Sequence, residues 1–403
     1  MPKKLVVVCL LNFFVAASLG LALRYSFIDP LPINYRFLTH AHSHVAMLGW
    51  VYLMLYTLIV HYFVPVKNPV FNTLFWLTEI AVLGMMVSFP FQGYSAVSIS
   101  FSTLHILCSY YFAYLIWKYH KTNSLVTRYL LRASLLFMLL STIGVWCLGP
   151  AVAMAGQASA FYQIAIQFFL HFQFNGWFII AVIALFFHQL QLHDSKKFRL
   201  FFKLLVVSTV LTFALPVYWF APHISLLWIN GLGVLLQLIA LFMFLKLSKP
   251  LLLVVLRGQS KLIVYLYSFA VFCFILKIVL QSVSLIPEIS KVIYLYHNFV
   301  IGFIHLTMLG IVTGFLFSFI VKSNLVKMNR WLHLAVYIFI LGFVLTELTL
   351  IIQGCMFYLK QGLLTNYYLL LFLFSMFLPL GIFMLLFNII THKNHEEQIA
   401  KTT

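Results

Sequence analysis

Acidic residues are scarce in this sequence, which has only seven Asp and Glu among 403 residues, against 25 Lys and Arg. Charged residues make up 8% of the chain and hydrophobic residues 64%. A soluble domain is therefore excluded, because so few polar groups cannot cover a water-exposed surface. The chain is predicted to be an integral membrane protein.

Cysteine is also rare, and its spacing excludes several kinds of site. The five cysteines fall in apolar runs without a CxxC pair, so a structural zinc site or a disulfide framework is not expected. No CxxCH stretch is present, so any haem would be bound without covalent attachment. The net charge of +18 resides in short loops, where it sets membrane orientation, and nucleic acid is not expected as a partner.

Long apolar runs are abundant, and twelve of them can cross about 30 Å of hydrocarbon as helices. The sequence therefore predicts an all-α membrane protein with a single polytopic domain over 1–391 and a short cytoplasmic tail over 392–403. No clear internal repeat is visible. The predicted spans are 5–24, 37–64, 70–91, 97–117, 128–150, 160–190, 199–219, 223–246, 260–283, 291–321, 331–354 and 364–391.

The loops alternate in charge, which predicts the orientation of the spans. Loops rich in Lys and Arg alternate with the loops 92–96, 151–159 and 217–222, which carry none. By the positive-inside rule both termini are cytoplasmic, in a bacterial-type inner membrane. As an alternative, Lys3, Lys4 and the apolar stretch up to "AASLGLA" form a cleaved secretory signal, which would remove the first helix.

Histidines are concentrated in the even-numbered spans. Eight of the fifteen lie in the outer half of the membrane or at its outer edge under this topology: His40, His42, His44, His105, His171, His223, His297 and His305. Only two acids, Glu79 and Glu347, lie within spans, so carboxylates are too few to pair with them. Imidazole without thiolate or carboxylate suits haem iron, copper or zinc, so a bound metal is the simplest common partner for these histidines.

Helical spacing assigns these histidines to faces. Residues four apart lie about 40° apart and residues two apart about 200°, so His40 and His44 share a face while His42 points away. His40 and His44 could therefore chelate one ion. His297 and His305 lie about 12 Å apart along their helix, which suits two stacked sites.

Two local motifs resemble a known family. "HSHVAMLGW" (42–50) has an H-x-H pair with Gly five residues after the second His and then an aromatic residue, and "HNFVIGFIHLTMLG" (297–310) contains an H-x-x-x-V-G-x-I-like stretch. With twelve helices and histidines on helices 2, 6 and 10, these resemble the haem-copper oxidase subunit I superfamily, and most closely NnrS-like haem-copper membrane proteins associated with nitric oxide stress.

The resemblance implies a b-type haem held by His44, or alternatively His42, together with His297, and copper near His171. It further implies a redox or gas-handling function with NO or O2 as ligand and a redox partner protein. Departures from the family put a complete copper centre in doubt, because helix 7 has no His-His pair and Asn175 stands where oxidases have a tyrosine. His223 and His305 could then supply ligands to a different centre, with His40 and His171 as the other candidate metal ligands.

Three charged residues within the predicted spans allow more than one interpretation. Glu79 and Glu347 suit either a proton path or a packing contact between helices. Lys277 could neutralise a haem propionate, but we expect its side chain to extend to the headgroup region.

Two other functions are alternatives to haem binding: one uses the same histidines, and the other gives them no role. The chain could be a transporter for a metal ion, haem or a small solute, although its Pro residues lie mostly at span ends and its histidines above the midplane. A structural subunit without a cofactor would leave the histidine cluster unexplained. Whether the chain is an oxidoreductase is left open.

Overall fold

The computed structural model describes residues 1–65 and 68–392, and within these ranges the fold is helical, without strands. Twelve helices of the described residues are long and apolar enough to cross a membrane, which confirms the predicted number of spans. They cover Lys3–Tyr25, Tyr35–Phe63, Pro69–Gln92, Ala96–Tyr119, Leu125–Ala155, Ala160–Gln189, Lys196–Phe220, Ile224–Val255, Lys261–Val283, His297–Lys322, Arg330–Tyr358 and Tyr367–Thr391.

The helices group into two compact units, each built from membrane-spanning segments. Unit 1 consists of residues up to Cys108 and from Leu316 onward, and unit 2 runs from Ser109 to Phe315. We predicted one polytopic domain over 1–391. Of the predicted tail, 392–403, residues 393–403 lie outside the described residues.

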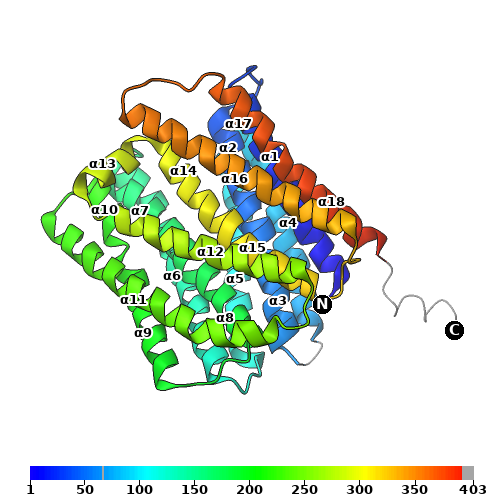
Figure 1. The fold of residues 1–403 in the computed structure, drawn as a ribbon. Helices are drawn as coiled ribbons and strands as arrows, with labels where there is room; N and C mark the ends of the chain where they lie inside the picture. Colours follow the sequence, from blue (N-terminus) through cyan, green and yellow to red (C-terminus); the bar gives the residue numbers. More distant parts are fainter. Residues whose placement is uncertain (66–67, 393–403) are drawn as a thin grey trace. The chain divides into compact units, whose positions relative to one another are not determined.

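Unit 1 contains the first and the last described helices of the chain (Figure 1). Its elements are α1 (Lys3–Tyr25), α2 (Tyr35–His44), the π-helical segment η1 (Val45–Tyr52), α3 (Leu53–Phe63), α4 (Pro69–Gln92), most of α15 (Thr313–Lys322), α16 (Arg330–Tyr358), α17 (Tyr367–Ser375) and α18 (Phe377–Thr391). Helix α5 (Ala96–Tyr119) passes from unit 1 into unit 2.

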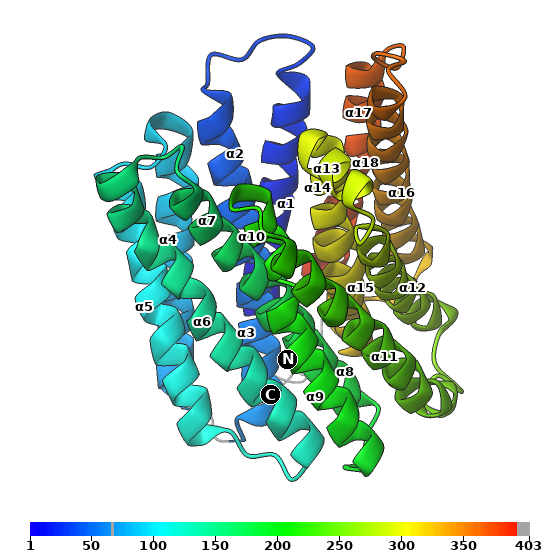
Figure 2. The same ribbon diagram turned by 90° about the vertical axis from the view of Figure 1, so that its left-hand side faces the viewer.

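Unit 2 contains the central part of the chain (Figure 2). Its elements are α6 (Leu125–Ala155), α7 (Ala160–His171), the π-helical segment η2 (Phe172–Phe178), α8 (Ile179–Gln189), α9 (Lys196–Leu211), α10 (Ala214–Phe220), α11 (Ile224–Val255), α12 (Lys261–Val283), α13 (Pro287–Leu295), α14 (His297–His305) and the π-helical segment η3 (Leu306–Val312).

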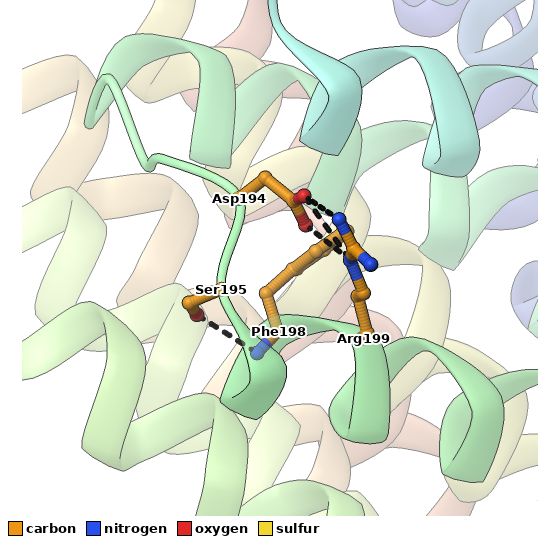
Figure 3. Close-up of polar contacts among 4 residues, drawn as sticks. All are labelled: Asp194, Ser195, Phe198 and Arg199. Atoms are coloured by element: carbon orange, nitrogen blue, oxygen red, sulfur yellow. Dashed lines mark hydrogen bonds and ion pairs between the residues drawn. The ribbon is translucent and has the colours of Figure 1, made fainter.

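Several helices begin at a side chain that accepts backbone N–H groups of the first turn. Ser195 begins α9 in this way, because its Oγ accepts from the Phe198 N–H at 3.1 Å (Figure 3). In the same turn the Arg199 guanidinium lies 2.6 Å from the Asp194 carboxylate. This hydrogen-bonded ion pair lowers the pKa of Asp194 below its ordinary value.

The first and last helices of unit 1 lie side by side, with the start of α1 next to the end of α18 (Figure 1). The Lys3 Nζ donates to the His392 carbonyl at 2.7 Å, so a cation satisfies a carbonyl that helix α18 leaves free. The start of α1 and the end of α18 therefore lie at the same end of this helix pair.

Three helix boundaries differ from the prediction by five residues or more. Helix α6 continues through Pro150 to Ala155, and α11 continues through Pro250 to Val255. A proline removes one backbone donor, but in a membrane-spanning helix neighbouring groups can compensate for the loss. The tenth span starts at His297, because the preceding residues form the separate helix α13.

Candidate functional site

A π-helical segment occurs in three of the described spans, and each begins directly after a histidine. These are the second, sixth and tenth spans, so the element returns every fourth span, a recurrence that the sequence alone did not reveal. In each case the fifth residue after the histidine is glycine. The pairs are His44 with Gly49, His171 with Gly176, and His305 with Gly310. Such segments are frequent at functional sites.

Glycine at this position lets a neighbouring helix approach closely. A Cβ on Gly49 would lie 2.9 Å from Val82 Cγ1 and 3.0 Å from Asn12 Cβ. The Asn12 Nδ2 donates to the Gly49 carbonyl at 3.2 Å and to the Glu79 carboxylate at 2.7 Å. The buried acid Glu79 is therefore tied through Asn12 to the backbone of the histidine-bearing helix.

His42 faces α1. Its Nδ1 lies 2.8 Å from the Ala16 carbonyl, so Nδ1 carries the proton and Nε2 is left as the basic nitrogen. Beside this ring stands Gly20, where an added Cβ would lie 2.8 Å from His42 Cε1. The absence of a side chain at Gly20 makes room for the imidazole against α1.

His40 and His44 share the opposite face, as their spacing predicts. The ring of His44 lies 4.4 Å from that of Phe89 on α4, and the ring of His40 lies 4.6 Å from that of Tyr94. His44 Nδ1 is 2.8 Å from the His40 carbonyl, so its Nε2 accepts from the Tyr94 hydroxyl at 3.3 Å. Both nitrogens of His44 thus have protein partners.

His105 is a candidate that sequence reasoning placed in the cluster but not among the ligands. It is buried in α5, with its ring 4.6 Å from that of Tyr52. Its Nε2 is buried without a hydrogen-bond partner in the described structure. A buried polar nitrogen without a partner is costly, which makes this atom a candidate ligand position. The sequence signal was a lone histidine in an apolar span, which does not specify a role.

His171 is held within unit 2 by backbone contacts. Its Nε2 lies 2.8 Å from the Thr209 carbonyl on α9, and the Asn175 amide donates to the His171 carbonyl at 3.2 Å. The ring is buried and fixed in one orientation, with Nδ1 as the nitrogen that can accept a proton or a metal.

The remaining predicted ligands occupy helix ends. His223 precedes α11, and its Nδ1 accepts from the Ser225 backbone N–H at 3.3 Å, so a helix-capping role accounts for this residue. His297 is exposed at the start of α14, and His305 ends the same helix before η3.

Metal ligation by three or more side chains finds no support in residues 1–65 and 68–392. No group of three or more His, Cys, Asp or Glu side chains in these ranges could hold an ion. The prediction that His40, His171 and His223 bind metal therefore rests on the sequence pattern alone. No protein-family model matches the chain, and no curated protein matches it.

The expected position of Lys277 is wrong. Its side chain is 1% exposed and lies inside unit 2, where Nζ donates to the side-chain amide oxygen Oε1 of Gln281 at 2.8 Å. The neighbouring helices enclose the side chain, so it does not extend to the headgroups.

Proposed function

We propose that this chain is a membrane protein that binds a b-type haem and serves a redox or gas-handling function. The observation that carries the proposal is the setting of His42. A histidine that ligates a metal almost always donates its other ring N–H to a carbonyl or carboxylate, which fixes the tautomer and the ring orientation. The contact between His42 Nδ1 and the Ala16 carbonyl has this form.

On helix 2 these contacts favour His42 over His44 as the iron ligand. The Nδ1 of His42 contacts a carbonyl on another helix, which fixes the ring relative to α1, whereas the Nδ1 of His44 contacts a carbonyl of its own helix. His297, the partner ligand suggested by the family resemblance, belongs to unit 2, and its pairing with helix 2 remains a prediction from sequence.

The same face of α1 offers a cation for the haem propionates. Ala16, Gly20 and Arg24 follow one another at intervals of four residues, so they share a face of α1. A guanidinium binds carboxylates by paired hydrogen bonds, and Arg24 would hold a propionate beside the His42 ring.

The bound haem would supply the redox or gas-binding chemistry. The residues of this chain would hold and orient it: His42 by Nε2, the Ala16 carbonyl by fixing the ring, and Arg24 by charge. Copper, and NO or O2 as the gas ligand, are proposed only through the family resemblance.

The test is a visible spectrum of detergent-purified protein made with ample haem, oxidised and then reduced with dithionite. We expect a Soret band, a low-spin spectrum and a pyridine haemochrome of b type. His42→Ala should abolish the low-spin signal and His44→Ala should keep it. A protein that folds but contains no iron would overturn the proposal, whereas the reverse pattern of the two variants would move the ligand to His44.

A further inference from the structure

A small polar cavity lies inside unit 2. It is lined by residues of η2, α8, α9, α11 and α12, and its polar lining consists of Asn175, Thr209, Gln237 and Lys277. The cavity has room for a particle of about the size of one water molecule.

Lys277 brings a charge into this cavity without a carboxylate to balance it. The acids of unit 2 are Asp194 and Glu288, and neither lines the cavity. Asp194 pairs with Arg199, and Glu288 is exposed at the start of α13. The ammonium donates to Gln281 and lies 5.6 Å from the centre of the Phe303 ring, which leaves donor capacity on Nζ. His171 is the titratable group within electrostatic reach of Lys277.

Two amide oxygens of the cavity lining lack donors in the described structure. These are Gln237 Oε1 on α11 and Asn175 Oδ1 on η2, both buried. The Gln237 side chain is 5% exposed, so bulk water does not reach it freely. An unsatisfied buried acceptor costs about 1 to 3 kcal/mol, so each oxygen needs a donor.

A single water molecule has the one acceptor and the two donors that these groups require. Its oxygen can accept from the Lys277 ammonium, and its two hydrogens can donate to Gln237 Oε1 and Asn175 Oδ1. Three hydrogen bonds are typical for a buried water. An anion would satisfy the lysine but would leave both amide oxygens without a donor.

We propose that Lys277, Gln237 and Asn175 bind one water molecule and form with it an internal hydration site of unit 2. Protons exchange between the ammonium N–H and the water O–H with no net change of charge. The site thereby gives a buried lysine a hydrogen-bonded water as its partner for proton exchange.

The test is NMR of protein whose lysine side chains carry ¹⁵N at Nζ, in detergent micelles. The Lys277 signal is identified as the one that Lys277→Met removes. We expect a cross-peak between this signal and water in the wild-type protein, and loss of most of its intensity in Gln237→Leu.

Asn230→Leu is the matched control for Gln237→Leu. Asn230 lies on the same helix and is 1% exposed with an unpaired Oδ1, but it does not line the cavity. Asn230→Leu should therefore keep the cross-peak. If the wild-type protein shows no water cross-peak at Lys277, or if both leucine variants reduce it equally, the proposal is overturned. Wild-type-like signals from the other lysines show that each variant is folded.

Discussion

Replacing Gly20 with alanine should weaken haem binding through His42 without touching any ligand atom. The added Cβ would lie 2.8 Å from His42 Cε1, whereas carbon atoms in contact are normally about 3.5 to 4.0 Å apart. The imidazole must therefore move by about 0.7 to 1.2 Å. That shift lengthens the 2.8 Å contact with the Ala16 carbonyl beyond hydrogen-bonding range.

The size of the effect follows from the lost orienting contact. Removing a group that orients a metal ligand typically costs about 10- to 100-fold in affinity. We expect Gly20→Ala to lose haem to an external acceptor such as apomyoglobin faster by a factor in this range, with part of its spectrum converted to high spin. Because helical Gly→Ala substitutions favour the helix by about 1 kcal/mol, the fold itself should persist.

Two comparisons separate this effect from a general one. Gly149→Ala adds a methyl group with nothing within 4 Å, so it should leave the spectrum and the haem affinity unchanged. If Gly20 acts through His42, adding Gly20→Ala to His42→Ala should have no further effect. The reasoning fails if folded Gly20→Ala protein keeps a low-spin spectrum and its haem affinity stays within about twofold of wild type.

Three further predictions concern packing, charge and orientation. Gly233→Ala should lower the thermal midpoint in detergent by an amount equivalent to about 1 to 3 kcal/mol, because its Cβ would lie 2.8 Å from Leu211 Cβ and 2.9 Å from the Thr212 nitrogen. A Cβ on Gly231 of the same helix meets nothing within 4 Å, so Gly231→Ala should leave the midpoint unchanged. A thiol-reactive dye reports this unfolding through the buried Cys273, and equal midpoints would contradict the packing. The ion pair with Arg199 lowers the pKa of Asp194 in the folded state, so the ionised carboxylate stabilises the fold at pH values above the unfolded-state pKa. This stabilisation is lost as pH falls through the folded-state pKa. The difference in stability between wild type and Asp194→Asn should therefore shrink in that acidic range. A difference that stays constant down to lower pH would contradict this role. In a Cys355→Ser background, Ala158→Cys should react with an impermeant thiol reagent in intact cells and His193→Cys should not, and the reverse result would invert the orientation.

The twelve spans were predictable because an apolar run of sufficient length specifies a membrane helix almost by itself. The ends of α6 and α11, predicted at 150 and 246, were missed, because both helices continue through a proline, Pro150 and Pro250. A proline inside a membrane helix is tolerated where neighbouring helices satisfy the backbone. The π-helical segments were also missed, since no residue pattern specifies an i→i+5 hydrogen bond. Lys277 was misplaced because its burial depends on residues from several other helices, which periodicity in one helix does not reveal.

The choice between His42 and His44 shows most clearly what sequence periodicity can and cannot provide. Spacing alone predicts that the two rings point in opposite directions. It cannot predict which ring faces α1, because in so hydrophobic a chain helix 2 could turn by half a rotation without exposing a polar stripe. The rotation depends on contacts with other helices: Gly20 makes room for one ring and Phe89 packs against the other. The proposed choice of ligand therefore depends on the residues that α1 and α4 place against helix 2, and Gly20→Ala tests it without altering a histidine.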